Sequence, residues 1–227
     1  MTGQEATHTQ RTPLSRARVL RAAVALADAT GIEALSMRRL AQELDVVPMA
    51  LYKHVANKEE LLDGMADAVV GEIDPPALDA DWRRAVRGRI LSARRALLRH
   101  PWAARVIETR PVPTPAVLAY LDSIAGTFRA GGLSADLTHH VMHAMGSRLL
   151  GFSQELFDTS GPAGPPDPLM AVHYPHIAEL AATAAHDGGS TVGGGCDDQF
   201  EFEFALDLLL DGFENLRRQG WTSERGA

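Results

Sequence analysis

The stretch Ser36–Lys58, SMRRLAQELDVVPMALYKHVANK, decides the fold, because it reads as two short helices joined by a tight polar turn. In its first half the apolar residues recur at helical spacing, and Ser36 precedes them as a helix cap. Pro48 fits the first turn of a second helix, which we expect to run to about Val55. Leu51 and Val55 give this second helix an inner face.

The outer face of the second helix carries side chains that a hydrophobic core does not need. Two helices joined by a three- or four-residue turn form a helix-turn-helix unit, whose second helix enters the DNA major groove. An ordinary helical hairpin with a mixed surface is the alternative. Lys53 can donate to guanine or phosphate, Met49 can contact a thymine methyl, and Tyr52 and His54 can hold phosphates. The DNA contacts predicted from this segment are Ser36, Arg38, Val47, Pro48, Met49, Tyr52, Lys53 and His54.

Residues 15–62 resemble the DNA-binding domain of TetR-family transcriptional repressors. The matching parts are a first helix that ends at Gly31 and the runs LSMRRLA (35–41) and ALYKHVANKEELL (50–62). The sequence departs from the family at Asp45, where glycine is usual in the turn. Aspartate tolerates the left-handed backbone better than most residues, so we expect the turn to form. The resemblance also implies that Lys58 contacts the DNA backbone.

Charge is distributed unevenly along the 227 residues, whose net charge is −7. Residues 1–58 carry eight Lys/Arg and five Asp/Glu, whereas the rest of the chain is strongly acidic. A basic end on an acidic body is expected when only one end meets phosphate. A net +3 on a small domain is also unremarkable, so this asymmetry supports the motif without standing alone.

Composition favours a globular protein in the cytoplasm. Apolar residues make up 45% of the chain, and no apolar run approaches the length of a membrane span. The first twelve residues are polar and lack the apolar core of a signal peptide, so we expect a disordered arm. Cys196 is the single cysteine, which excludes an internal disulfide. We expect no membrane partner.

Helical patterns broken by proline and glycine continue to the end of the chain, which predicts an all-α protein. We expect a three-helix DNA-binding domain at residues 1–58 and a ligand-binding and dimerisation domain at residues 59–227. Residues 81–99 form an arginine-rich amphipathic helix. Its arginines are either a second nucleic-acid patch or a solvated face with acidic partners elsewhere, and the second interpretation is favoured.

The last predicted helix, from about residue 199 to 218, has an apolar repeat with spacings of 4, 3, 4 and 3. Such a repeat gives a seam for a partner helix, and the alternative is a core within the chain. By resemblance to the tetracycline-repressor-like C-terminal class, this helix and the one at residues 134–157 pack against a second copy. Two recognition helices about one DNA turn apart would then read a palindromic operator. The seam residues are Phe202, Leu206, Leu209, Phe213 and Leu216.

Effector contacts are predicted by the same resemblance. His100, Arg110 and Pro111 match drug-contacting positions, and Ser147 stands where these relatives have a metal-binding histidine. That missing histidine argues against a magnesium–tetracycline ligand. His143 lies one helical turn from Ser147 and can face the same space. We predict an unidentified small-molecule effector and no cofactor.

No arrangement of residues in the sequence predicts catalysis. GxSxG, P-loop and GxGxxG patterns with the right context are absent, and His139, His140 and His143 lack the glutamate of an HExxH site. We therefore predict a ligand-responsive transcriptional repressor without bound metal. Two alternatives remain, namely a DNA-binding protein that takes no small ligand and a helical metal-dependent enzyme.

Overall fold

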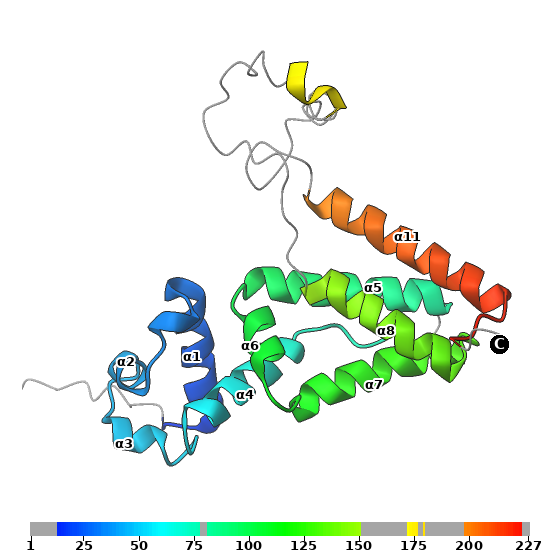
Figure 1. The fold of residues 1–227 in the computed structure, drawn as a ribbon. Helices are drawn as coiled ribbons and strands as arrows, with labels where there is room; N and C mark the ends of the chain where they lie inside the picture. Colours follow the sequence, from blue (N-terminus) through cyan, green and yellow to red (C-terminus); the bar gives the residue numbers. More distant parts are fainter. Residues whose placement is uncertain (1–12, 78–80, 151–171, 177–178, 180–197, 224–227) are drawn as a thin grey trace, which may run out of the picture. The chain divides into compact units, whose positions relative to one another are not determined.

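The computed structural model describes residues 13–77, 81–150, 172–176, 179 and 198–223. Every element of regular structure in these ranges is helical, as predicted (Figure 1). The elements are α1 (Arg16–Thr30), the 3-10 turn η1 (Ile32–Ala34), α2 (Met37–Glu43), α3 (Pro48–Leu51), α4 (Lys58–Val70), α5 (Trp82–Arg99), α6 (Ala103–Thr109), α7 (Pro115–Ala130), α8 (Ala135–Leu150) and α11 (Asp198–Arg218).

The residues group into two compact units. The first comprises Met1–Leu78 and Gly88–Gly126, and the second comprises Asp79–Arg87 and Thr127–Ala227. The first unit therefore holds α1 to α4 and α6 entirely, while the second holds α8 and α11. Helices α5 and α7 contribute residues to both units. Each unit is described below by itself.

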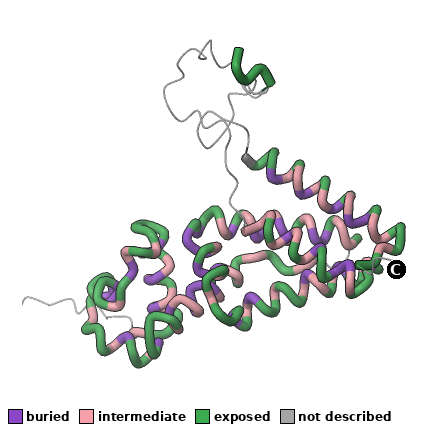
Figure 2. The backbone as a smooth tube through the Cα atoms, viewed as in Figure 1, coloured by how far each residue is buried: buried purple, intermediate pink, exposed green. Residues whose placement is uncertain are grey.

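Helices α1, α2 and α3 surround a small apolar core in the first unit. Val19 and Ala23 from α1 meet Leu40 from α2 and Leu51 from α3, and all four are fully buried. Buried positions recur along one side of each helix, which the alternating colours make visible (Figure 2). The helices thus form because their apolar stripes converge on one interior.

Side-chain caps fix where these helices begin. The hydroxyl oxygen of Ser36 accepts a hydrogen bond from the Arg39 backbone N–H at 3.2 Å, as predicted. Asn57 Oδ1 likewise accepts from the Glu60 N–H at 2.8 Å and starts α4. Each cap satisfies a backbone donor that the first turn leaves free.

The turn between α2 and α3 keeps its form without glycine. Asp45 has φ of 52°, the only positive φ of a non-glycine residue in the described ranges. The Val46 N–H donates to the Ala41 carbonyl at 2.9 Å, which closes the turn over the end of α2. The expectation that aspartate would tolerate this backbone is confirmed.

Helix α3 is shorter than predicted, because regular helix ends at Leu51 rather than near Val55. Hydrogen-bonded turns continue its path, with the His54 and Val55 N–H groups donating to the Leu51 carbonyl at 2.8 and 3.0 Å. The chain must leave helical geometry here, because Asn57 has extended backbone angles as the cap of α4.

The rest of the first unit packs around α4. This helix contacts α1 on one side and α6 on another. Its buried residues include Leu61, Met65 and Val69, which lie in the same apolar cluster as Trp102 and Val106 at α6. One continuous core therefore connects the three N-terminal helices with α4 and α6.

In the second unit, α8 packs against α11. Phe128 is fully buried, with its ring edge-on to Phe213 at 6.2 Å and tilted against Trp82 at 5.7 Å. Leu137 and Leu206 are also buried. Among the described helices, none has the length and apolar character that crossing a bilayer requires.

Several predicted features lie outside the described residues. These are the N-terminal arm at 1–12, the final turns of the helix predicted for 134–157, and the Pro/Gly-rich loops at 158–168 and 186–197.

Candidate nucleic-acid interface

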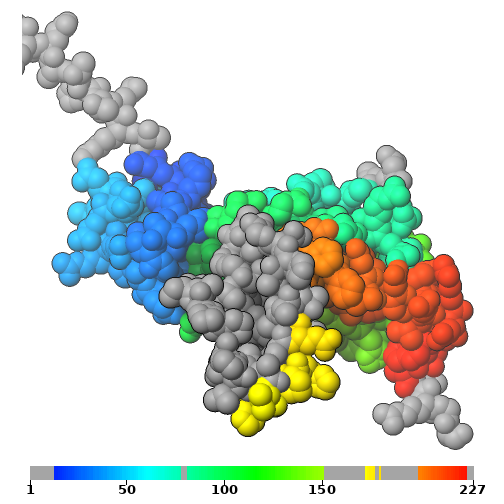
Figure 3. Space-filling view, turned by 90° about the horizontal axis from the view of Figure 1, so that it is seen from above, coloured from blue at the N-terminus to red at the C-terminus, as the bar shows by residue number. Residues whose placement is uncertain are grey.

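The segment from Val47 to His54, which we call the reading segment, presents most of its side chains to solvent. Val47 is 68% exposed, Met49 71% and Tyr52 44%, and Pro48 and Lys53 are exposed as well. Figure 3 shows this part of the chain, in light blue, at the surface of the molecule. Exposed valine, methionine and tyrosine on so short a segment do not stabilise the core.

Two inner side chains hold the reading segment in place. Leu51 is fully buried and Val55 is 1% exposed, so the segment is fastened through its inner side alone. The Ala56 N–H donates to Glu60 Oε2 at 2.6 Å, and Glu60 also lies 3.4 Å from the Arg16 guanidinium. The segment is thus tied to the start of α4 and to α1.

The basic side chains around the segment are exposed and lack internal partners. Arg38 lies in the first turn of α2 and Lys58 begins α4, and both are exposed like Lys53. Among the described residues, no carboxylate lies within ion-pairing distance of these three. Their charge is therefore available to an external anion. Ser36 is exposed but its oxygen is engaged as a cap, and His54 is half-buried.

The arginines of α5 differ from these three basic residues, because they form ion pairs with carboxylates of the same chain. Arg87 contacts Asp207 at 2.7 Å and Glu203 at 2.6 Å, and Arg83 pairs with Asp211. In the first unit, Arg95 pairs with Asp74 and Arg99 with Glu72. The interpretation as a face with acidic partners is confirmed for these four arginines.

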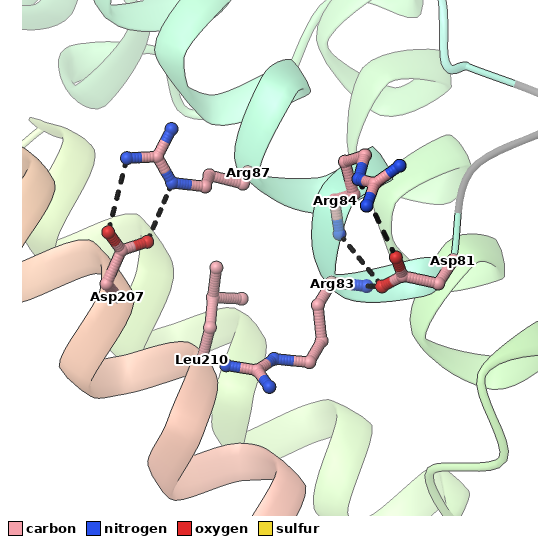
Figure 4. A pocket seen from close by; sticks show the side chains of 6 residues that line it. All are labelled: Asp81, Arg83, Arg84, Arg87, Asp207 and Leu210. Carbon is pink, nitrogen blue, oxygen red and sulfur yellow. Dashed lines mark hydrogen bonds and ion pairs between the residues drawn. The ribbon is translucent and has the colours of Figure 1, made fainter.

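Side chains of α5 and α11, with Asp81 directly before α5, line an open cleft of about 260 Å³ (Figure 4). Asp207 faces the Arg87 guanidinium with both oxygens, while Leu210 gives the cleft an apolar wall. The hydrogen bonds that Arg87 donates to Asp207 and Glu203 raise the pKa of Arg87. Hydrogen bonds donated by Gln199 and then by Arg87 lower the pKa of Glu203. Both shifts favour the ionised pair.

Of the predicted effector contacts, two are already engaged inside the first unit. His100 is buried between Asp28 and Glu72, and the Arg110 side chain, 11% exposed, pairs with Glu59 and Asp63 of α4. Pro111 is exposed in the same unit, while His143 and Ser147 are exposed on α8 in the second unit.

Sequence reasoning did not single out Tyr120 as a site residue. Its hydroxyl is buried with no hydrogen-bond partner, and burial raises the pKa of Tyr120 to about 12. The Arg89 guanidinium lies 5.0 Å from the centre of the Tyr120 ring, and the Arg89 Nε is also buried without a partner. Unsatisfied buried polar atoms are uncommon, and no pattern along the sequence could reveal them.

The predicted dimer seam lies largely in the core of its own unit. Phe202, Leu206 and Phe213 are between 0 and 6% exposed, whereas Leu209 and Leu216 are half-buried. The outward apolar residues of α11 are Phe200, Phe204 and Leu208, with exposures of 62, 54 and 57%. Phe200 and Phe204 stack at 6.3 Å.

The histidines of α8 approach one another without forming a metal-binding group. The His139 and His143 rings are 4.8 Å apart, and His140 lies 3.6 Å from Asp136. Within the described ranges, no group of three or more His, Cys, Asp or Glu side chains could hold a metal ion.

Comparison with known proteins gives two family matches that together span most of the chain. Residues 19–65 match the family described as bacterial regulatory proteins, tetR family. Residues 75–217 match the family described as tetracyclin repressor-like, C-terminal domain.

Curated relatives include known repressors. The chain is 37% identical to the HTH-type transcriptional repressor DrrR1 of Streptomyces coeruleorubidus over 59% of this chain and 50% of the relative. It thus spans about half the length of this relative. It is 31% identical to the tetracycline repressor protein class C of Escherichia coli over 90% of this chain and 92% of the relative.

Solved structures agree with the sequence matches. A possible TetR family transcriptional regulator from Streptomyces coelicolor has a TM-score of 0.70 at 29% identity, covering 89% of this chain and 100% of that one. ActR from the same organism, solved with (S)-DNPA, has a TM-score of 0.67 at 28% identity, covering 89% and 98%. BioQ, solved with its double-stranded DNA operator, has a TM-score of 0.62 at 26% identity, covering 89% and 99%.

Proposed function

This chain belongs to the TetR family of bacterial regulatory proteins, and we propose that it is a ligand-responsive transcriptional repressor. It binds a palindromic DNA operator as a homodimer and is released by a small-molecule effector. DNA binding is assigned to residues 1–58, and effector binding and dimerisation to residues 59–227. Because its proposed target is DNA, we place it in the cytoplasm.

One observation carries the proposal: the reading segment exposes most of its side chains to solvent, while buried residues hold its backbone in place. Leu51 and Val55 fix the backbone, while Met49, Tyr52 and Lys53 remain exposed. A short rigid element with apolar, aromatic and cationic tips suits the edges and phosphates of a major groove. We assign base reading to Lys53 and Met49, and phosphate contacts to Arg38, Tyr52 and Lys58. Ser36, Val47, Pro48 and His54 complete the surface.

Footprinting on the DNA beside the gene for this chain tests the assignment. We expect two protected half-sites related by a two-fold axis. Lys53→Ala should weaken operator binding more than non-specific binding at fixed salt. Equal losses on operator and random duplex would show that Lys53 contacts only the backbone, and no preferred duplex at all would overturn the repressor proposal.

Dimerisation is assigned to the outward side of α11, next to α8. Phe204 and Leu208 are more than half exposed and lie one helical turn apart. Burying such residues against a second copy would remove apolar area from water. Of the seam predicted from sequence, Leu209 and Leu216 can flank this contact, whereas Phe202, Leu206 and Phe213 support it from inside.

Sedimentation of the double variant Phe204→Glu, Leu208→Glu tests this surface. We expect a monomer that retains its helical content and loses operator binding, because one reading segment covers only half of the palindrome. Phe200→Glu beside it is a milder companion change. A double variant that stays dimeric would assign the interface elsewhere.

The effector site is assigned to the helical body, with Tyr120 and Arg89 as the leading polar contacts. Their buried atoms lack partners, and a ligand with hydroxyl or carbonyl groups would satisfy them. His100, Arg110 and Pro111 from the sequence analysis lie in the same unit, and His143 and Ser147 remain secondary candidates on α8. An effector can change operator binding only if its affinity differs between two arrangements of the DNA-binding domains in the dimer.

A compound panel tested for release of the protected duplex identifies the effector. Tyr120→Phe should lower the effector's potency without changing operator affinity, since it removes only the hydroxyl. If no compound releases the duplex, the alternative of a DNA-binding protein without a small ligand gains support. Metal-dependent hydrolysis lost in a His139→Ala, His143→Ala double variant would instead support an enzyme.

A further inference from the structure

His100 is placed between two carboxylates from distant parts of the chain. Its Nδ1 lies 2.8 Å from Asp28 Oδ1, and its Nε2 lies 3.2 Å from Glu72 Oε1. The His100 side chain is only 10% exposed. Asp28 belongs to α1, Glu72 follows α4, and His100 itself lies between α5 and α6. One imidazole therefore joins three segments of the first unit.

Only the doubly protonated ring satisfies both contacts. A neutral imidazole has one N–H donor and one acceptor, so one of its nitrogens would face a carboxylate as a second acceptor. The imidazolium has two donors, and each of them meets a carboxylate. When the ring loses a proton, one of these hydrogen bonds is lost. Because the ring is nearly buried, water can hardly replace that hydrogen bond.

Both carboxylates beside the ring also accept hydrogen bonds from other side chains. Trp102 Nε1 donates to the same Asp28 oxygen at 2.7 Å, and Arg99 donates to Glu72 at 2.6 Å. The Arg99 bond, followed by the charge of His100, lowers the pKa of Glu72. The titratable and charged groups that face His100 are thus Asp28 from α1, Glu72 after α4 and Arg99 from α5, with opposite charges adjacent.

We propose that His100 is a proton-dependent clamp that couples operator affinity to pH. With the ring protonated, α1 and the end of α4 are held to the α5–α6 corner, which fixes the reading segment's support. With the ring neutral, one contact is lost and the support loosens, so ordering it on DNA costs more. Operator affinity is therefore higher at acidic than at alkaline pH. This proposal rests on the proposed function, because the operator is its readout.

The stability effect has a definite sign. The clamp contributes while both ring nitrogens carry a proton, and it is lost when rising pH removes one of them. At the acid end the contacts also need ionised carboxylates, and the pKa of Glu72 is lowered. The informative range is therefore about pH 5 to 8.5, which begins above the ordinary pKa of carboxyl groups and ends above the ordinary pKa of histidine.

The test compares the wild-type full chain with His100→Gln, His100→Lys and Asp28→Asn on the duplex protected in footprinting. The wild-type to His100→Gln affinity ratio should fall about fivefold from pH 6 to pH 8.5, a modest coupling between sites. His100→Lys keeps a cation throughout this range, so its ratio to His100→Gln should stay constant. The reading segment, His54 included, is the same in every variant, so its own contribution cancels from these ratios.

Thermal melting without DNA tests the clamp by itself. Wild type should melt above His100→Gln and Asp28→Asn at pH 6, and these differences should narrow by pH 8.5. His140→Gln, which removes an exposed histidine paired with Asp136, serves as the control and should show a much weaker trend, because water screens this pair. Constant differences in both melting and affinity overturn the clamp. Absence of any preferred duplex overturns the proposed function, while the melting data still decide the clamp.

Discussion

The reading segment and helix α5 are both basic, yet their side chains have opposite surroundings. Lys53 is exposed, and no ion pair engages it among the described residues. Arg87, in contrast, binds two carboxylates of α11. The comparison shows that basic residues indicate a nucleic-acid surface only when nothing in their own fold already neutralises them. Arginine density alone would have favoured α5.

The largest expected effect comes from removing the tips of the reading segment. Tyr52→Ala with Lys53→Ala should weaken operator binding roughly a hundredfold, because two direct contacts are lost at about 1–3 kcal/mol each. The matched control is Arg83→Ala with Arg84→Ala on α5, expected to change affinity less than about twofold. Fluorescence anisotropy at fixed salt measures both. A larger loss from the α5 control would reverse the comparison.

Stability should respond in the opposite order. Arg87→Ala leaves Asp207 and Glu203 facing each other without their cation, and we expect a loss of about 1–2 kcal/mol, because the group is one-third exposed. Arg87→Lys should recover only part of this stability, since a lysine keeps the charge but cannot bind Asp207 with two parallel donors. Urea unfolding gives the values. Lys53→Ala should be neutral in the same assay.

Acid should remove the contribution that the α5–α11 ion pairs make to stability. The pKa of Glu203 is lowered in the folded chain, so its stabilisation is present above its ordinary titration and is lost as pH falls through the lowered value. The melting difference between wild type and Arg87→Ala should therefore shrink from pH 7 to pH 3. A difference that holds or grows in acid would mean that packing, rather than charge, accounts for it.

The smallest effect concerns the cap at the start of α2. Ser36→Ala removes the oxygen that accepts the Arg39 N–H and should cost about 1 kcal/mol of stability, while Ser36→Asp should be tolerated. Circular dichroism melts measure this change. Operator affinity separates two roles, because Ser36→Asp restores the cap but places a negative charge near phosphate. Equal DNA binding by Ser36→Asp and wild type would limit Ser36 to capping.

Local features of the fold were predictable from sequence because they depend on neighbouring residues. Helix α7, for example, begins at Pro115 and ends at Ala130, directly before two glycines. Ser36 caps its helix as expected, and Asn57 and Ser134 cap theirs in the same way, since a cap acts within three residues. The exposure of the reading segment follows similarly from the helical spacing of Leu51 and Val55.

Features that depend on which segments meet were not predictable. The repeat in α11 showed an apolar stripe at Phe202 and Leu206 but not whether a second copy or the chain itself covers it. His100 meets Asp28 across 72 residues, and Arg110 meets Glu59 across 51. A one-dimensional pattern gives the faces of each helix but not their partners, so residues matched to drug contacts by resemblance proved to be engaged by carboxylates.

The bond between the Ala56 N–H and Glu60 has a mechanical consequence. The backbone that leaves the reading segment reaches the Asn57 cap of α4 within three residues, and Ala56 and Asn57 both form hydrogen bonds with Glu60 in the first turn of α4. Because no flexible linker separates α4 from the reading segment, a tilt of α4 should move the base-contacting side chains with it. A small movement of α4 would therefore shift the reading segment by a similar amount. A regulator with this connection needs only a small conformational change to lose affinity for its operator.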